Sequence, residues 1–428
     1  MNYRKFMTCI TVVSAIVLLA LWVNDFVSVS GQGKQTKKYD YLNITDSNLK
    51  FEVMAKGFKF ATGMVFLDSN DILVTEKNTG NVIRIQNGIK LDKPVLAVNV
   101  SNQSERGLLG IAVTDEGSVP RYVFLYFTET DSENRSKILG NRLYRYELVA
   151  NNSQLINPKL LLNLPFLPGP SHNGGVLKIG PDRNSLYIAI GNLNFIQDPR
   201  YFNQAQNVKN SPPPDGRGGI LRITYDGNVI GGKGILGEIS PLNLYYAYGL
   251  RNSFGIGFDH VTGNLWDTEN GQDTNDEINL VKPGFNSGFR VIQGPSSLKE
   301  NFKISDLESF EDKGIYRDPE FDWLDTVAPT SVLFLNSSKL GKDYESDLFV
   351  GSVKNGTIYH FDMNDDRTHL DLDGPLRDRI ANTPKELAGV TFAKGLGIIT
   401  DLEDGPDGYL YVLSFPKHDG TIFRISPR

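Results

Sequence analysis

The chain of 428 residues has very little cysteine, few histidines and no long block of one charge. Its single cysteine, Cys9, lies in the first apolar segment, so the rest of the chain can form no disulfide bond and no cysteine metal site. Lys and Arg total 44 and Asp and Glu total 50, which gives a net charge of -6 without a basic cluster. We therefore expect no nucleic-acid partner. With 40% hydrophobic residues, the chain must gain its stability from packing.

Long hydrophobic runs are also missing, except for one at the N-terminus. Arg4 and Lys5 precede an apolar run over residues 7–23, and small residues and a polar stretch follow it. This order is typical of a secretory signal peptide, but the run is also near the shortest length that spans a bilayer. We therefore expect residues 1–31 to be a signal peptide or an N-terminal membrane anchor attached through residues 7–23. Basic residues before the run favour an extracytoplasmic body, secreted or held on the outer face of the cell membrane.

Apolar stripes of helical period are scarce in the body of the chain, where a different pattern recurs. After a polar linker over residues 32–48, a turn rich in Asp, Asn, Gly or Pro leads into a short apolar run of β-forming residues, often followed by a second turn and run. Six copies of this pattern occupy residues 66–85, 120–130, 180–192, 259–271, 344–363 and 405–425.

A regular array of small antiparallel sheets predicts a β-propeller. We expect residues 49–428 to form an all-β, six-bladed propeller with four-stranded antiparallel blades. A pair of β-sandwiches is the alternative, but it leaves the six similar units unexplained. Because the last copy ends near the C-terminus, a strand near residues 51–53 is expected to pair beside it and close the ring.

Glycine gathers beside charged and amide side chains in residues 245–288. Arg251 and Asn252 lie between glycines, which allow sharp turns and the close approach of a ligand. An arginine there offers a fixed fork of donors to carboxylate or carbonyl oxygens. The acidic, amide-rich loop that follows supplies the hard oxygen ligands that calcium prefers. A structural alternative is also open, in which Arg251 simply pairs with Glu269 or Asp276 inside the fold.

Histidine is rare enough for one position to stand out. His172 lies in the segment GPSHNGG, beside two glycines and on a loop that leads into the third copy. This placement suits a general base, although a loop histidine bonded to the backbone would have the same surroundings. Thr326 precedes the fifth copy and Lys354 follows its first strand, without a signal of their own. The acidic segment 362–373 lacks the glycine that a calcium loop requires, so we expect a solvated loop.

Several segments, taken in order, resemble the glucose/sorbosone dehydrogenase family, the soluble sugar dehydrogenases that use pyrroloquinoline quinone. The resemblance covers residues 57–428 and rests on ERGLLGIA (105–112), HNGG (172–175), YGLRN (248–252), residues 269–279, VAP (327–329) and GPDG (405–408). It implies a six-bladed propeller that oxidises an aldose sugar at C1 to a lactone. The hydride passes to bound pyrroloquinoline quinone with calcium (Ca2+) at the site, and the electrons then pass to an external acceptor.

The resemblance also implies roles for individual residues. His172 matches the base that takes the proton from the anomeric hydroxyl, and Arg251 matches the arginine that polarises the quinone carbonyl. The other implied roles are cofactor contact at Asn252, Thr326 and Lys354, calcium binding through the backbone oxygens of Gly271 and Gln272, and substrate contact at Glu105.

The chain departs from the family where two arginines usually hold cofactor carboxylates. Alignment on Asp401 and Leu402 puts Ile398 and Thr400 at those positions. Two lost charged hydrogen bonds weaken binding by roughly 1.5–3 kcal/mol each. The alternative function is therefore a non-catalytic extracellular propeller that binds glycans or proteins, and a metal-dependent lactonase on a similar propeller is a third reading.

Overall fold

The computed structural model describes residues 41–149, 154–193, 205–207, 209, 213–416 and 419–428. The signal peptide or anchor expected at residues 1–31, and the linker up to residue 40, lie outside these ranges. Within them, no helix combines the length and the apolar character needed to cross a membrane. The described chain is built from β-strands and short 3-10 helices.

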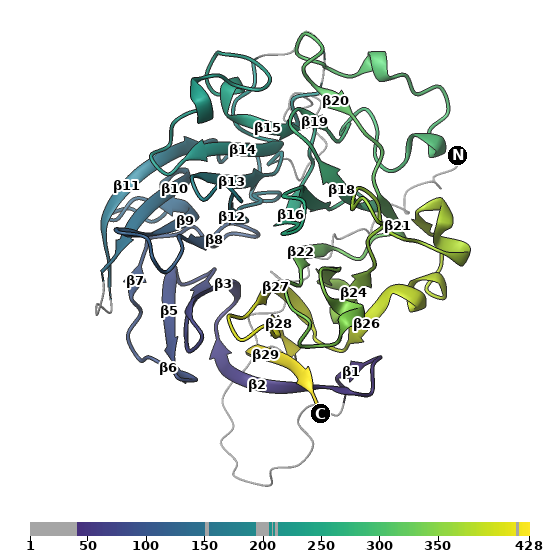
Figure 1. Ribbon diagram of the computed structural model, residues 1–428. Helices are drawn as coiled ribbons and strands as arrows, with labels where there is room; N and C mark the ends of the chain where they lie inside the picture. Colours follow the sequence, from purple (N-terminus) through teal and green to yellow (C-terminus); the bar gives the residue numbers. More distant parts are fainter. Residues whose placement is uncertain (1–40, 150–153, 194–204, 208, 210–212, 417–418) are drawn as a thin grey trace, which may run out of the picture.

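Six sheets of four to six strands make up the fold. In chain order their innermost strands are β3 (Ala61–Asp68), β8 (Leu108–Val113), β12 (Leu177–Ile179), β16 (Ser253–Phe258), β22 (Pro329–Phe334) and β27 (Ile398–Asp404). Each innermost strand packs against the next, and β27 packs against β3, so the sheets surround a common axis (Figure 1). The chain is therefore an all-β propeller.

The sheets continue outward from these strands. The first contains β4 (Asp71–Glu76), β5 (Asn81–Gln86), β6 (Ile89–Lys90) and β7 (Leu96–Ala97); the second contains β9 (Arg121–Thr130), β10 (Ile138–Leu148) and β11 (Leu155–Leu164). The third contains β13 (Ser185–Ile190), β14 (Gly219–Thr224), β15 (Tyr245–Tyr248), β19 (Phe285–Asn286) and β20 (Ile315–Tyr316). The fourth contains β17 (Leu265–Glu269), β18 (Thr274–Val281), β21 (Phe321–Asp325) and β25 (Ile380–Ala381).

The last two sheets contain both ends of the described chain. The fifth contains β23 (Leu348–Ser352), β24 (Ile358–Phe361), β26 (Thr391–Lys394) and β1 (Asn43–Ile44); the sixth contains β28 (Leu410–Phe415), β29 (Gly420–Pro427) and β2 (Leu49–Phe58). The described 3-10 helices are η2 (Ile230–Gly232), η3 (Leu242–Leu244), η4 (Ser296–Leu298), η5 (Ile304–Asp306), η6 (Lys342–Tyr344), η7 (Lys354–Gly356), η8 (Gly374–Asp378) and η9 (Glu386–Val390).

The prediction of four antiparallel strands in every sheet is wrong. Only the second and sixth sheets have four strands, and the others gain short strands at an edge. Strands β19 and β20 come from an inserted segment. Strand β19 pairs in parallel with β15, β20 pairs in parallel with β19, and β25 pairs in parallel with β21. Each of these additions has only two residues, which is enough to cover an open sheet edge.

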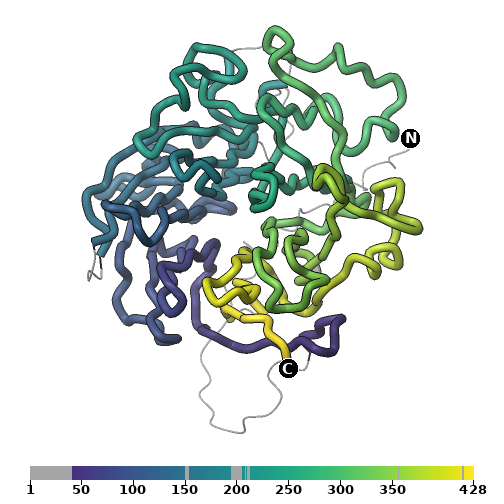
Figure 2. Tube along the Cα trace, in the orientation of Figure 1, coloured from purple at the N-terminus to yellow at the C-terminus, as the bar shows by residue number. Residues whose placement is uncertain are grey.

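The sixth sheet joins the start of the described chain to its end. Strand β2 pairs with β29, with Phe51 opposite Ile425 and Val53 opposite Phe423. Figure 2 shows the purple start of the described chain beside its yellow end. The predicted closing strand near residues 51–53 is thereby confirmed. Strand β1 pairs with β26, so the described part of the expected linker, residues 41–48, contacts the propeller.

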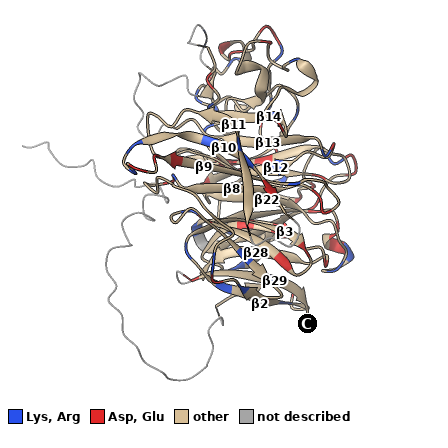
Figure 3. Cartoon of the chain, turned by 90° about the vertical axis from the view of Figure 1, so that its left-hand side faces the viewer, with Lys and Arg blue, Asp and Glu red and all other residues tan. Residues whose placement is uncertain are grey.

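The core consists of apolar layers between neighbouring sheets. Leu73 and Val82 of the first sheet, for example, lie in one buried cluster with Val123 and Phe127 of the second. Figure 3 shows acidic and basic residues interspersed over the chain, while most of the strand surface belongs to other residues. Packing between sheets therefore holds the ring together and leaves its axis free for other contacts.

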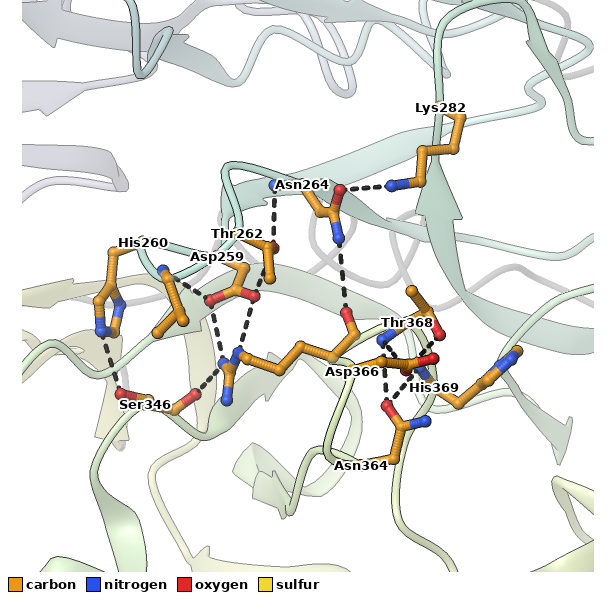
Figure 4. A network of polar contacts seen from close by, with 12 residues as sticks. Asp259, His260, Thr262, Asn264, Lys282, Ser346, Asn364, Asp366, Thr368 and His369 are labelled. Atoms are coloured by element: carbon orange, nitrogen blue, oxygen red, sulfur yellow. Dashed lines mark hydrogen bonds and ion pairs between the residues drawn. The ribbon is translucent and has the colours of Figure 1, made fainter.

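A polar network joins the fourth and fifth sheets away from the axis (Figure 4). The fully buried carboxylate of Asp259 accepts hydrogen bonds from Nε and Nη2 of Arg367 at 2.8 and 3.0 Å, and from Thr262 at 2.6 Å. Arg367 belongs to the segment 362–373. That segment keeps exposed acids such as Asp366, as expected of a solvated loop, but its arginine anchors it to the fold.

Candidate active site

The predicted site residues lie on loops at one end of the axis. Glu105 precedes β8, His172 precedes β12, Arg251 precedes β16 and Thr326 precedes β22. Because the innermost strands of a propeller run in the same direction, the loops before them open on one face. Lys354 follows β23, the antiparallel neighbour of β22, so its turn returns to that face. The fold thus gathers candidates from four successive sheets (Figure 1).

His172 is buried and held at two points. Its backbone, with φ of 59°, donates an N–H to Oε2 of Glu105 at 2.6 Å, and its ring Nδ1 lies 2.7 Å from Oδ1 of Asn192. An amide oxygen only accepts, so Nδ1 carries the hydrogen and Nε2 keeps its lone pair. Burial, and then the charge of Arg251, holds the pKa of His172 well below its usual range. The ring is therefore a neutral, oriented proton acceptor.

Arg251 does not make the side-chain ion pairs that the structural reading expected. Its Nη1 donates to the carbonyl of Asn270 at 2.8 Å, while its backbone N–H donates to Oε1 of Glu269 at 2.6 Å. Burial lowers the pKa of Arg251, and the nearby acids, Glu105 first, partly oppose this shift. Next to it, Oδ1 of Asn252 is buried without a hydrogen-bond partner. Both side chains keep polar capacity that a ligand could use.

The turn at Gly271 and Gln272 is fixed through its amides. The N–H of Gly271 donates to Oδ1 of Asp276 at 2.8 Å, and that of Gln272 donates to Oε1 of Gln293 at 3.1 Å. The second oxygen of Asp276 accepts from the amides of residues 327–328, which ties this turn to the segment before β22. Burial raises the pKa of Asp276 to about 6. Backbone oxygens beside such acids suit a hard cation such as calcium.

Thr326 and Lys354 meet although they are 28 residues apart in the sequence. The ammonium of Lys354 donates to Oγ1 of Thr326, and its backbone N–H donates to the carbonyl of Val327. In the described part of the chain no carboxylate forms an ion pair with either Lys354 or Arg251. Both cations are therefore available to an anionic or carbonyl-bearing ligand.

One residue at this end was not predicted from the sequence. The ammonium of Lys77 donates to the carbonyls of Ser104 and Arg106 at 2.7 and 2.9 Å, on either side of Glu105, and to the side chain of Asn78. Burial lowers the pKa of Lys77 to about 8. In the sequence, Lys77 belongs to an ordinary hairpin turn, VTEKNTGN, and no local signal links it to residues almost 30 positions later.

A cavity of about 140 Å3 lies along the axis next to these residues. Lys77, Ser104 and Glu105 line it, together with small and aliphatic residues of the innermost strands. Ile398 and Thr400 also line it, so the positions where the family carries arginines face this space with a hydrocarbon and a hydroxyl.

An ion pair crosses the axis at the same cavity. Nζ of Lys178, on β12, lies 2.6 Å from Oε1 of Glu403, on β27, and these strands belong to opposite sheets of the ring. Asp401 lines the cavity beside them and accepts the backbone N–H of Met64. Burial, and then the charge of Glu403, raises the pKa of Asp401 to about 8.

The donor set fits the quinone and calcium that the resemblance implies at the catalytic end. Among the described residues, Oδ1 of Asn252 has no hydrogen-bond partner and no carboxylate pairs with Arg251 or Lys354, so these polar groups can bind a ligand. Ile398 and Thr400 offer no charge to the carboxylates of such a cofactor.

Comparison with known proteins identifies the family of the chain. The family model for glucose/sorbosone dehydrogenase matches residues 58–424. The aldose sugar dehydrogenase YliI of Escherichia coli is 25% identical over 384 residues, which cover 89% of this chain and 94% of that protein. The quinoprotein glucose dehydrogenase B of Acinetobacter calcoaceticus is 27% identical over 357 residues, which cover 69% of this chain and 73% of that protein.

Solved structures share the fold over nearly the whole described chain. The apo form of the soluble aldose sugar dehydrogenase of Escherichia coli is 25% identical, with a TM-score of 0.68, and the match covers 89% of this chain and 100% of that one. The pyrroloquinoline quinone-bound aldose sugar dehydrogenase of Streptomyces coelicolor is 22% identical, with a TM-score of 0.65, and the match covers 90% and 99%.

Proposed function

The chain belongs to the glucose/sorbosone dehydrogenase family, and from this membership we propose that it oxidises an aldose sugar at C1 to a lactone, with pyrroloquinoline quinone as hydride acceptor and calcium at the site. The relatives make it an oxidoreductase of the sugar dehydrogenase type. The fold part of the proposal is a six-bladed propeller, which the six described sheets support when each is taken as one blade. The external electron acceptor and an extracytoplasmic location, by secretion or by an anchor, are parts of the same proposal.

The observation that carries this proposal is the state of His172. Its ring is buried and neutral, and Asn192 orients it so that Nε2 keeps a free lone pair. Such a group can take the proton of an anomeric hydroxyl while hydride leaves the sugar carbon. Burial and the nearby charge of Arg251 disfavour the imidazolium, so the ring is neutral before it accepts the proton.

Arg251 and Asn252 contribute polarity at the position expected for the cofactor. The bound quinone would supply an electrophilic carbon that accepts hydride. Arg251 is held by a backbone carbonyl and keeps its charge, so its remaining N–H groups can stabilise negative charge on a carbonyl oxygen. Asn252 would orient the same group, while Thr326 and Lys354 would bind it from the fifth sheet. The backbone oxygens of Gly271 and Gln272 would hold the calcium ion.

Calorimetric titration of pyrroloquinoline quinone into the purified protein, with and without calcium, tests the proposal. We expect calcium-dependent binding that Arg251→Ala weakens, followed by sugar-dependent reduction of an artificial acceptor. The control variant is Arg145→Ala, because Arg145 pairs with Asp226 at the outside of the propeller. Absence of binding at tens of micromolar would overturn the proposal.

A non-catalytic propeller that binds glycans or proteins is the second candidate. The replacement of cofactor-binding cations by Ile398 and Thr400 in the cavity wall favours it. Failure to bind quinone, combined with retention on an immobilised glycan array, would support this candidate. The lactonase reading gains no support, because among the described residues the group with metal-ligand spacing, Asp347, His360 and Asp362, lies in the outer part of the fifth sheet.

A further inference from the structure

The turn at residues 103–107 grips the loop that carries His172. Three consecutive side chains of the turn make the contacts. Oγ of Ser104 lies 3.2 Å from Oγ of Ser171, and Oε2 of Glu105 accepts the backbone N–H of His172 at 2.6 Å. Arg106 donates from Nη2 to the carbonyl of Phe166 at 2.6 Å. These hydrogen bonds fix the position of the loop relative to the turn, so a shift of the turn would move the loop.

Lys77 supports the same turn from the other side. Its ammonium binds the carbonyls of Ser104 and Arg106, the two peptide groups that flank Glu105. Its own carbonyl accepts the N–H of Leu108 at 3.0 Å. A Cβ added to Gly107 would lie 2.3 Å from Cγ of Lys77, so the turn packs tightly on the lysine stem. A shorter or uncharged side chain would leave two inward-facing carbonyls without their donor.

Glu105 itself has no side-chain cation within ion-pair distance among the residues that the structure describes. The amides of His172 and Asn173 bind its carboxylate, and Arg251 and Lys77 act on it through space. Only 6% of Glu105 is exposed. Since one carboxylate oxygen is committed to the backbone of His172, the residue is poorly placed to give both oxygens to a sugar.

We propose that Glu105 and Lys77 are positioning residues for His172: Lys77 fixes the turn, and the Glu105 carboxylate holds the left-handed backbone of His172 so that its ring stays on Asn192. This inference rests on the proposed function for the role of His172 as base, and it replaces substrate contact as the main task of Glu105. A charge-assisted hydrogen bond is shorter and stronger than a neutral one, so the ionised carboxylate holds the loop more firmly.

The protonation of Glu105 should be visible in the amide resonance of His172, because that amide donates to the Glu105 carboxylate. Burial raises the pKa of Glu105 to about 7, while its bonds to the backbone amides and the charges of Arg251 and Lys77 pull the pKa down. The amide of His172 therefore reports, near neutral pH, whether its acceptor is charged. Loss of Lys77 removes one stabilising charge and is expected to move the midpoint of that titration upward.

Selective 15N-histidine labelling of the full chain tests this without any activity measurement. The protein has five histidines, and His172→Gln identifies the signal of His172. We expect the His172 amide to titrate with a midpoint near pH 7, Glu105→Gln to abolish that titration, and Lys77→Met to raise its midpoint. Lys77→Arg should restore the original behaviour. Lys90→Met is the matched control, because Lys90 is another lysine of the first sheet that donates to a backbone carbonyl, that of Gly57 on β2.

A His172 amide signal that does not respond to pH between 5.5 and 8.5 and is unchanged in Glu105→Gln would overturn the inference, whether or not the protein oxidises sugars. If it does, Glu105→Gln should lower kcat by about tenfold to 100-fold with little change in KM, as misplacement of a base does. A rise in KM with unchanged kcat would instead identify Glu105 as a substrate contact. Should Lys77→Met fail to fold, the Glu105→Gln spectra decide the question alone.

Discussion

Buried charges at the two ends of the axial cavity are held in different ways. At the end that faces the loops, Arg251 donates to a carbonyl, Glu105 accepts from an amide, and Lys77 donates to two carbonyls. At the other end, Lys178 and Glu403 bind each other directly across the axis. The first arrangement uses the backbone as partner, and the second uses an opposite charge.

This difference separates two tasks. Backbone groups fix a charged side chain in place without cancelling its charge, so its field remains available to a ligand. An ion pair cancels its own field and, once buried, mainly makes each partner depend on the other. The loop end of the cavity is therefore arranged to act on a bound molecule, whereas the pair of Lys178 and Glu403 links opposite sheets of the ring.

The largest expected effect is the loss of activity on substitution of His172 at the loop end of the cavity. In His172→Gln the amide can still bind Asn192, but it cannot accept a proton at neutral pH. We expect sugar-dependent acceptor reduction to fall by about 10^2–10^4-fold, while calorimetric affinity for the quinone changes little. Wild-type turnover in this variant would show that the loop end does not supply the base.

The other end should respond in stability. Lys178→Met leaves the buried acids Asp401 and Glu403 without their cation, and we expect a loss of about 2–4 kcal/mol in the free energy of unfolding at pH 8. The loss should shrink at pH 5, where the carboxyls can take up protons. Urea unfolding measures the free energy of unfolding at both pH values. The quinone affinity of the folded variant is measured beside it.

A double variant tests whether Lys178 and Glu403 act as a pair. Lys178→Met combined with Glu403→Gln removes both charges and should recover part of the lost stability. If the double variant is less stable than Lys178→Met by the full additive amount, the two residues do not act as a pair.

The buried ion pair of Arg367 and Asp259 lies away from the cavity and serves as a reference for the charged groups at its two ends. Arg367 binds Asp259 through two nitrogens, and lysine cannot reproduce this fork (Figure 4). We expect Arg367→Lys to lower the free energy of unfolding by about 1–2 kcal/mol without changing quinone binding. Thermal unfolding monitored by circular dichroism, beside calorimetry, checks this; weakened quinone binding would contradict the independence of this network.

The last prediction concerns the pH dependence of stability at Asp401. Because burial raises its folded pKa to about 8, above the ordinary carboxyl range, the folded protein keeps a proton that the unfolded chain releases. Its contribution to stability is thus present at low pH and is lost as pH rises toward 8. Asp401→Asn cannot ionise, so its stability relative to wild type should increase between pH 5 and 8.5, by roughly 1.4 kcal/mol for each pH unit up to pH 8. Urea unfolding at both values measures it; a decrease would reverse the assigned direction of the shift.

The strand pattern of the sequence was sufficient to predict the propeller and its closure. Each copy contains a turn between apolar runs, and the run near residues 51–53 needed a partner at the C-terminus. The two-residue strands β19, β20 and β25 could not be predicted, because a two-residue ladder has no periodicity. Their pairing depends on where the insertions lie once the ring has formed.

Site residues were visible in the sequence only where the backbone itself is unusual. His172 and Arg251 lie beside glycines, and the resemblance assigned their roles. Lys77 occupies an ordinary turn and contacts groups almost 30 residues away, so nothing in its own segment indicates its position. The local sequence of Lys178 and that of Glu403 also give no sign of their contact, because the two residues come together only when opposite sheets meet at the axis.

The pairing of β2 with β29 has a consequence for how the protein reaches its folded state. Contacts such as that of Glu52 with Arg424 join residues 372 positions apart, so the entropy of closing this loop opposes their early formation. Strand β29 lies between β2 and β28, and both have an open edge until it docks. Strand β27, which brings Thr400 and Asp401 to the cavity, belongs to the same sheet. A nascent chain therefore cannot complete its ring and its cavity before strand β29 has been synthesised.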